Sequence, residues 1–341
     1  MHSHKKQPKH LAILFALLCV SILAVGCSQS DTVGQTQLPK LPTPPTQTQV
    51  NDAKDKVLQH FHLFLSQKAT PRKSSASDPL AYHQGTTMRA TSVDYVIFWE
   101  PSQLPDGAAT HVSATYNSLI KRYFQDIGGS SLYQNNSQYY DKNGHIVNSS
   151  TFGGAWVDTS AYPIPQPGCL DPAALHGCLM DSQIQDEVTK AMHANGWTGG
   201  LNHLFYVYTS ASEGSCMTSF NPSQCAYTAY CAYHSFYNKG NQTILYANMP
   251  YADSGCNVKA SPNNDIDADS AISVTSHEHM EAVTDGHLDA WYDTSGNEIG
   301  DKCAWDFGSL SLDGGKANEQ WNGHYYIVQR EWSNSKAGCV L

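Results

Sequence analysis

The sequence predicts a mixed α/β (α+β) fold, with a mixed sheet, one long helix and a loop-rich C-terminal part clamped by disulfides. Three observations predict it. Apolar runs of strand length alternate with stretches of helical periodicity. One of these stretches, residues 269–284, is long and has apolar residues on the side that would pack on a sheet. Residues 287–341 have turn-forming composition and two cysteines but little periodicity.

The first 26 residues have the three parts of a secretory signal peptide. Lysines precede an apolar run that ends at Val25, and small residues lead up to Cys27. The run is short for a membrane span. A cysteine directly after Ala-Val-Gly resembles the bacterial lipobox, so we expect residues 1–26 to be a lipoprotein signal peptide. Cys27 would then carry a lipid anchor that holds a surface-exposed, extracytoplasmic protein on the bacterial cell membrane. An ordinary signal peptide with an incidental cysteine is the alternative.

Residues 27–90 are expected to form a polar tether that contains one helix. Residues 28–50 are rich in Gln, Thr, Ser and Pro, a composition that buries no core and predicts an extended spacer. Residues 52–67 place apolar side chains on one helical face and predict an amphipathic helix, which either packs on the body or belongs to a pro-segment. A polar stretch at about 70–90 then leads into one metallohydrolase-like domain over residues 91–341, which is long enough for a substantial core.

Cysteine usage and charge limit the compartment and the partners. Eight cysteines follow Cys27, and an even number in an exported chain predicts up to four disulfides. Cys169–Cys178 and Cys303–Cys339 are candidate pairs, whereas thiolate metal ligation is the weaker alternative because the chain has no C-x-x-C. The net charge is −10 and no basic stripe is present, which argues against nucleic acid as a partner.

Periodicity and turn signals predict the elements of the body in order. An Asn143-Gly144 pair predicts a hairpin turn. Helices are expected over residues 112–127 and 182–194, the second with Asp181 as its N-cap and Gly196 past its end. Strands are expected at Val93–Trp99, Ala155–Val157, Leu204–Tyr208, Tyr230–Phe236 and Thr243–Ala247.

The long helix, expected to start at Asp269 or Ser270 and to end before Gly286, carries an H-E-x-x-E motif, a variant of the metalloprotease motif H-E-x-x-H. Positions i and i+4 of a helix share a face, so His277 and Glu281 can bind one metal ion together. Glu278, about 100° round the helix, can act as general base toward a metal-bound water. A solvated polar helix face is the alternative.

A strand-bearing domain followed by this helix and a downstream acid resembles the general plan of zincin metallopeptidases, by analogy of plan only. Thermolysin-like members take their third ligand from a later Glu that an Asp follows, which implies Glu298 and Asp301. The acid that does not bind metal is expected to hydrogen-bond His277. Metzincins place the third ligand ten residues after the first, which implies His287. Asp285, one turn beyond Glu281, is a further candidate.

A closer resemblance, to the plant phosphate-induced/EXORDIUM family, covers about the last 70 residues and, weakly, the whole body. HEHMEAVTD and AWYDTSGNEIGDKC are similar to that family's H-E-x-x-E-x-x-T-N-P, Trp-Tyr and E-I-G-D-x-C, with Asp285-Gly286 in place of Asn-Pro. Cys231 to His234 resembles its short Cys-x-x-His strand. The resemblance implies one constellation of these residues in a secreted or wall-associated protein that affects growth.

These patterns predict a cell-surface zinc-dependent hydrolase, and among hydrolases a metallopeptidase that acts on a peptide or protein. Zinc would activate a water, Glu278 would take its proton, and His234 is a candidate to polarise the substrate carbonyl. One alternative is a non-catalytic extracellular module in which the same residues hold a structural ion such as Ca²⁺. Another is a wall-glycan hydrolase that uses Glu278 and Asp301 as paired carboxylates.

Overall fold

The computed structural model describes residues 61–69, 78–163, 177–218, 221–252 and 255–341. All of them belong to one compact unit, Gln47–Leu341. The expected signal peptide, Cys27 and the spacer 28–50 lie outside the described residues, so the lipid anchor stays a prediction. Among the described residues, no helix combines the length and the apolar character that crossing a membrane would require.

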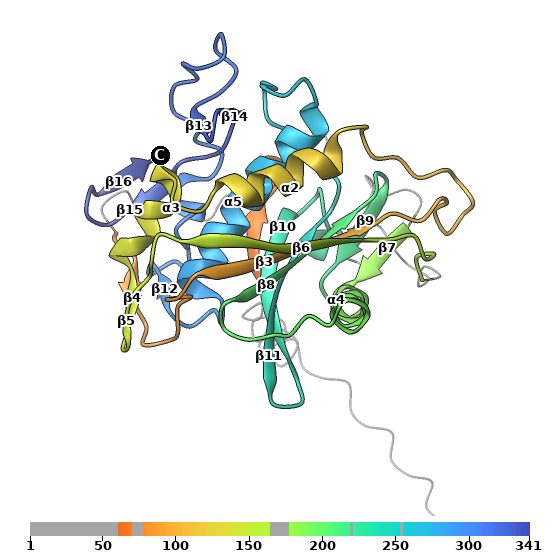
Figure 1. Ribbon diagram of the computed structural model, residues 1–341, viewed down its shortest axis with the longest axis horizontal. Coiled ribbons are helices and arrows are strands. Elements are labelled where there is room, and N and C mark those ends of the chain that lie inside the picture. Colours follow the sequence, from red (N-terminus) through yellow and green to blue (C-terminus); the bar gives the residue numbers. More distant parts are fainter. Residues whose placement is uncertain (1–60, 70–77, 164–176, 219–220, 253–254) are drawn as a thin grey trace, which may run out of the picture. The chain divides into compact units, whose positions relative to one another are not determined.

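A six-stranded mixed sheet forms the centre of the fold, in the order β1-β10-β11-β8-β3-β6 (Figure 1). Strands β11, β8, β3 and β6 run parallel to one another, whereas β10 is antiparallel to β11 and β1 is antiparallel to β10. The predicted mixed sheet is therefore confirmed. The strands span His62–Leu65 (β1), Ser92–Trp99 (β3), Ser150–Asp158 (β6), His203–Thr209 (β8), Tyr230–Lys239 (β10) and Gln242–Met249 (β11).

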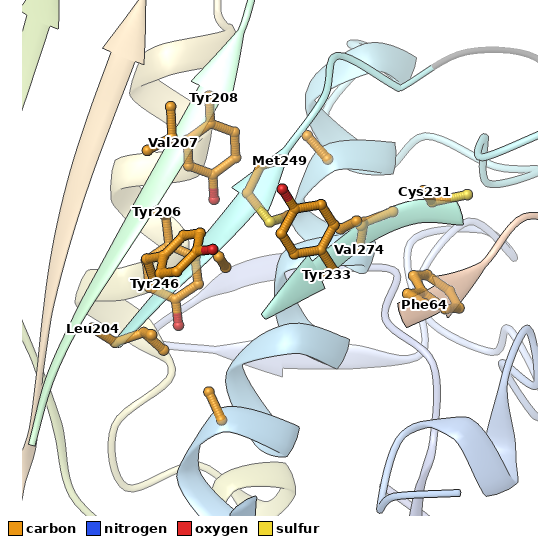
Figure 2. Packing of buried hydrophobic residues seen from close by; sticks show 14 of the residues in the cluster. Phe64, Leu204, Tyr206, Val207, Tyr208, Cys231, Tyr233, Tyr246, Met249 and Val274 are labelled. Atoms are coloured by element: carbon orange, nitrogen blue, oxygen red, sulfur yellow. The ribbon is translucent and has the colours of Figure 1, made fainter. Parts of the chain in front are cut away.

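Three longer helices pack against the sheet: α2 (Tyr116–Asp126), α4 (Asp181–Asn195) and α5 (Ile266–Asp285). Successive residues of a strand point to opposite faces. The hydroxyl groups of Tyr208 on β8 and Thr275 on α5 are hydrogen-bonded to each other. On the other face, the hydroxyl of Tyr246 on β11 donates to the carboxylate of Asp181 on α4. Aromatic side chains of β8, β10 and β11 thus fill the core on both sides of the sheet (Figure 2).

Three helix starts differ from those expected. Asp265, rather than Asp269 or Ser270, is the N-cap of α5, and its side chain accepts from the backbone N–H of Ala268. Asp269 instead accepts from Ser261 and Asn263 of the preceding loop. α2 begins at Tyr116 rather than at residue 112, and Met180 rather than Asp181 is the N-cap of α4. The expected helix ends at Gly196, with φ 68°, and at Gly286 are confirmed.

The predicted amphipathic helix over residues 52–67 is wrong where the structure describes it, because His62–Leu65 forms β1. A short apolar run fits a buried strand as well as a helix segment. Here pairing with β10 decides, since Phe64 becomes fully buried and stacks between the rings of His277 and Trp305. Part of the expected tether is therefore built into the sheet.

The remaining described elements are short. The hairpin predicted at Asn143-Gly144 is present between β4 and β5, with Lys142 and Asn143 in its turn. The C-terminal part is loop-rich, as expected, and contains only brief strands. These elements are β2 (Ala81–Tyr82), β4 (Tyr140–Asp141), β5 (Gly144–His145), β7 (Gly177–Met180), β9 (Glu213–Cys216), β12 (Trp291–Tyr292), β13 (Glu319–Trp321), β14 (His324–Tyr326), β15 (Glu331–Ser333) and β16 (Gly338–Val340), with α3 (Ser131–Gln134), η1 (Asn135–Gln138), η2 (Pro222–Gln224) and η3 (Asp301–Cys303).

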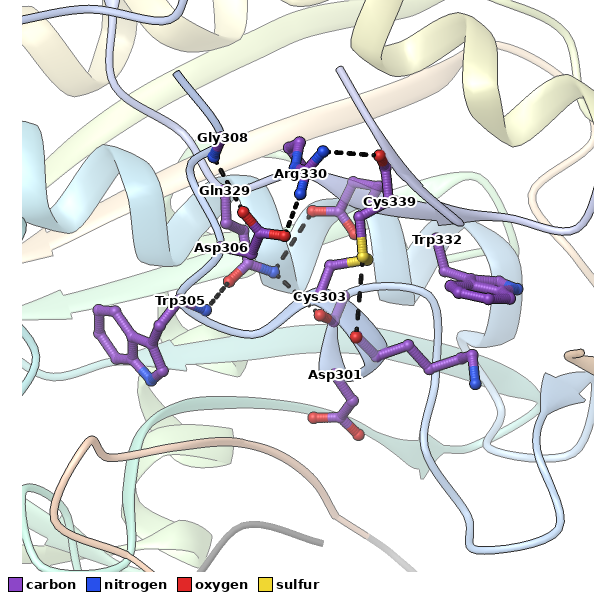
Figure 3. The surroundings of a disulfide bond; sticks show 12 residues. Asp301, Cys303, Trp305, Asp306, Gly308, Gln329, Arg330, Trp332 and Cys339 are labelled. Carbon is purple, nitrogen blue, oxygen red and sulfur yellow. Dashed lines mark hydrogen bonds and ion pairs between the residues drawn. A yellow bond between two sulfur atoms is a disulfide. The ribbon is translucent and has the colours of Figure 1, made fainter. Parts of the chain in front are cut away.

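Three disulfides join described cysteines: Cys216–Cys225, Cys231–Cys256 and Cys303–Cys339. The last confirms the expected clamp and ties η3 to β16, near the C-terminus (Figure 3). The expected partner of Cys178, Cys169, lies outside the described residues. Disulfides of this number indicate an oxidising, extracytoplasmic environment.

Candidate metal centre

The H-E-x-x-E motif lies in the middle of α5 and is buried. His277, Glu278 and Glu281 are each 0% exposed, because α5 packs against β10 and β11 of the sheet and beside α2. The alternative of a solvated polar helix face is therefore wrong. Buried carboxylates and imidazoles require partners, and in proteins such groups are paired, hydrogen-bonded or bound to metal.

The first group of candidate donors joins the motif to the E-I-G-D segment. Donor atoms of His277, Glu281 and Asp301 all lie within 4.8 Å of one another. His277 Nε2 is 3.1 Å from Glu281 Oε1 and 4.0 Å from Asp301 Oδ1. These residues were expected to converge and the structure brings them together, with the backbone N–H of Asp301 also donating to Glu281 Oε1 at 3.0 Å.

A second group shares Glu281 and adds a residue that sequence reasoning missed. Donor atoms of His62, His234, Glu281 and Glu298 lie within 4.8 Å of one another. His62 Nδ1 is 3.1 Å from Glu281 Oε2 and 3.5 Å from Glu298 Oε1. His234 Nε2 is 3.3 Å from Glu298 Oε2 and 3.8 Å from Glu281 Oε2. His62 was missed because its segment was assigned to a helix in the tether; no motif marks it.

Strand pairing places the two histidines of the second group. His62 of β1 lies directly opposite His234 of β10, and their ring centroids are 5.6 Å apart. Side chains of directly opposed residues in an antiparallel pair point to the same face. Both rings therefore face α5, where Glu281 lies. His234, a candidate to polarise a substrate carbonyl, lies within this cluster of donors, and its catalytic role stays a prediction.

A glycine lets the downstream segment approach the helix. A Cβ on Gly300 would lie 2.5 Å from His277 Nδ1 and 3.0 Å from Glu281 Oε1, closer than a real side chain tolerates. Asp293 holds the turn before this segment by accepting from the backbone and side chain of Asn297. The Cys303–Cys339 disulfide holds it from the other side. The segment that carries Glu298 and Asp301 is thus fixed at both ends.

The second nitrogen of His277 contacts an amide rather than an acid. Gln329 Nε2 is 2.6 Å from His277 Nδ1, so the expectation that Glu298 or Asp301 would hydrogen-bond His277 through this atom is wrong. Metal binding through Nε2 requires a proton on Nδ1. A half-turn of the Gln329 amide would present its oxygen to that proton, at the expense of the bond that Nε2 donates to Gly300 O and of the bond that Oε1 accepts from Trp305 N–H. Gln329 lies 52 residues from the motif, and no sequence signal marks it.

The pKa values of residues in the centre shift in different directions: that of Glu298 is raised, and those of Glu281 and His234 are lowered. Burial, and then neighbouring carboxylates, raise the pKa of Glu298 well above its ordinary range. Burial also acts to raise the pKa of Glu281, but His277 and His62 outweigh it and lower that pKa well below its ordinary range. Burial lowers the pKa of His234 to about 3, so its ring is neutral, the form that binds metal.

Several polar atoms of the cluster are buried without hydrogen bonds. Both ring nitrogens of His234 and Oε2 of Glu298 have no hydrogen-bond partner. Leaving a buried polar atom unsatisfied costs about 1–3 kcal/mol. A cation among these donors would satisfy them, and a mixed set of imidazole nitrogens and carboxylate oxygens suits zinc. The residues present therefore fit a metal ion.

Glu278 lies beside the donors but belongs to neither group. Burial, and then the charges of Glu281 and Asp301, raise its pKa well above the ordinary range, while the backbone of Phe64 and His234 acts in the opposite direction. Neither of its oxygens has a hydrogen-bonding side chain. Glu278 is therefore close to the donors without belonging to them, and its role as general base stays a prediction.

The other two expected third ligands, Asp285 and His287, make hydrogen bonds of their own. Asp285 accepts from the backbone N–H groups of Asp289 and Ala290, both at 2.6 Å, and so holds the loop after α5. His287 makes a 3.0 Å hydrogen bond between its Nδ1 and the hydroxyl of Thr86. Neither residue belongs to a donor group among the described residues.

Comparison with known proteins adds no relative. No family model matches the chain, and no curated protein matches it. The resemblance to the EXORDIUM family therefore stays a prediction.

Proposed function

We propose that this chain is an extracytoplasmic, metal-dependent hydrolase, and specifically a zinc metallopeptidase. The observation that carries the proposal is the group His277, Glu281 and Asp301 with Glu278 beside it. Three protein donors leave a position for water, which is the pattern of catalytic rather than structural zinc.

In this proposal His277, Glu281 and Asp301 hold the ion. When bound, zinc acts as a Lewis acid and lowers the pKa of a bound water to about 7. Glu278 takes the proton at its carboxylate and delivers it to the leaving group. Its raised pKa supports this role, since a base with an ordinary carboxylate pKa holds a proton poorly at neutral pH.

The substrate class and the location rest on the sequence. The H-E-x-x-E motif and the zincin-like order of elements support a peptide or protein as substrate. The lipobox-like Cys27 supports a lipid anchor on the bacterial cell membrane, and the similarity of E-I-G-D-x-C to the EXORDIUM pattern supports a wall-associated role.

A non-catalytic module with a structural ion is the second candidate. It is favoured by the other donor group, in which His62, His234, Glu281 and Glu298 come from four separate parts of the chain and are all buried. Four protein donors without an open position are typical of structural zinc.

The test compares Glu278→Gln with Glu213→Gln, a matched change at a buried glutamate of β9 outside both groups. In assays on unfolded protein and on peptide libraries, the wild type and Glu213→Gln should cleave. Glu278→Gln should retain metal and lose at least 100-fold in kcat, in line with general-base contributions. A chelator should abolish cleavage by the wild type. A glycosidase that uses carboxylates alone would keep its activity in the presence of a chelator. Metal-bound wild type without hydrolysis of any peptide would favour the structural module.

A further inference from the structure

We propose that the centre holds two divalent cations, bridged by the carboxylate of Glu281. The first position is formed by His277, Glu281 and Asp301, and the second by His62, His234, Glu281 and Glu298. The first position is the one that binds the hydrolytic ion of the proposed function, and to that extent the inference rests on the proposed function. The second position is a new site.

The two oxygens of Glu281 face different sets of donors. Oε1 is 3.1 Å from His277 Nε2 and accepts from Asp301 N–H at 3.0 Å. Oε2 is 3.1 Å from His62 Nδ1 and 3.8 Å from His234 Nε2. A carboxylate placed in this way binds one ion through each oxygen. Such bridges are usual in two-metal sites, whose ions lie about 3.5–4 Å apart.

The donors do not form one cluster around a single point. Ligand atoms of one zinc ion lie about 2.0–2.2 Å from the metal, and so within about 4.4 Å of one another. Asp301 and His277 fall outside the group that contains His234 and Glu298, although all four lie close to Glu281. One ion at either position would leave the donors of the other without a metal.

Charge also favours two ions. Glu281, Glu298 and Asp301 supply three carboxylates to the two groups, and Glu278 and Asp285 lie close to them. The basic partners of Glu281 and Glu298 are histidines, which are neutral when they ligate. Two divalent ions therefore offset more of this buried negative charge than one ion does.

An independent observation points to a ligand at the second position. His234 is 0% exposed, neither of its ring nitrogens has a hydrogen-bond partner, and Nε2 is directed at Glu298 and Glu281. Buried polar side chains nearly always have a partner, and an ion that is not drawn is one of the recognised explanations for an exception.

The second position is closed, since all four donors come from the protein. An ion there joins β1, β10 and α5, and fixes the orientation of Glu281 for the first position. Its role is therefore structural toward β1 and supportive toward the hydrolytic ion.

Metal content tests the proposal. The full chain, exported and purified without chelator, should contain two equivalents of zinc by plasma mass spectrometry. Asp301→Asn and His234→Ala should each reduce this to one equivalent. His287→Gln changes a histidine outside both donor groups that sequence spacing also marks as a ligand, and should keep two. Circular dichroism confirms that each variant is folded; Asp301→Asn, which preserves side-chain shape, keeps the test decisive if His234→Ala does not fold.

A second measurement tests the bridge. Protein reloaded with Mn²⁺ should give an exchange-coupled electron paramagnetic resonance spectrum at two equivalents and an uncoupled spectrum in Asp301→Asn. One equivalent in the wild type, or two uncoupled ions, would overturn the inference. Two coupled ions without peptide hydrolysis would leave the inference standing and remove the proposed function. Hydrolysis by a protein with one ion would do the reverse.

Discussion

His62 and His234 are direct partners across the β1–β10 strand pair, and both rings point at the carboxylate of Glu281 on α5. β1 is therefore joined to α5 through the candidate metal centre as well as through the sheet. Phe64, two residues along β1, adds stacking contacts with His277 at a ring-centroid distance of 4.0 Å. Metal binding and the docking of β1 should be coupled.

His62→Ala should weaken that coupling. The variant should lose the ion of the second position, and chelator should then lower its melting temperature less than that of the wild type. An ion at 1,000 times its Kd stabilises a folded protein by about 4 kcal/mol. Thermal unfolding with and without chelator measures the difference. His83→Ala changes an exposed histidine that stacks on Tyr292 and serves as control. An equal effect of chelator on His62→Ala and wild type would contradict the coupling.

The sequence predicted the parts of the fold and centre that depend on local pattern. The i,i+4 spacing of His277 and Glu281 fixes their common face, and the strands β3, β8, β10 and β11 follow from apolar runs. Contacts between distant segments carried no local signal. His62 joins the centre only because β1 pairs with β10, and Gln329 reaches His277 across 52 residues. The start of α5 was misplaced because three aspartates lie within five residues, and the loop contacts of Asp269 decide between them.

The Cys303–Cys339 disulfide should contribute to metal affinity as well as to stability. Cys303 lies two residues after Asp301, so the bond holds a candidate ligand against α5 (Figure 3). Replacing both cysteines by serine should cost about 2–4 kcal/mol of unfolding free energy. It should also weaken metal binding by about 10-fold or more, as loss of support around ligands does.

The Cys216–Cys225 pair provides the matched control, because neither cysteine lies next to a residue of the donor groups. Its double serine variant should lose stability in urea unfolding but keep the wild-type metal affinity in a competition titration. Equal metal affinity of both double variants would show that the clamp has no role in the centre.

Glu213 should make stability depend on pH. Burial, and then the charge of Asp106, raise the pKa of Glu213 from 4.5 to about 8. Because the folded state holds the proton more tightly than the unfolded state, the contribution of this group is fully present below pH 4.5. It is lost as the pH rises toward 8. Glu213→Gln should therefore gain stability over the wild type across this interval, by a few kcal/mol in order of magnitude. Urea unfolding at several pH values measures the difference; parallel stability curves would contradict the assignment.

Gly300→Ala should remove the first metal position while leaving the backbone conformation allowed. Gly300 has φ −77° and ψ −43°, which alanine adopts readily, so any effect comes from the added methyl group. That methyl would lie 2.5 Å from His277 Nδ1 and 2.8 Å from its Cε1, and the downstream segment must move away from α5. Overpacking of this kind costs about 1–3 kcal/mol.

Zinc content of Gly300→Ala should fall from two equivalents to one, and peptide hydrolysis should be lost. Gly338→Ala, where the nearest atom would lie 3.9 Å from the methyl, should change neither. Retention of two zinc ions by Gly300→Ala would show that Asp301 does not need this close approach to reach the metal.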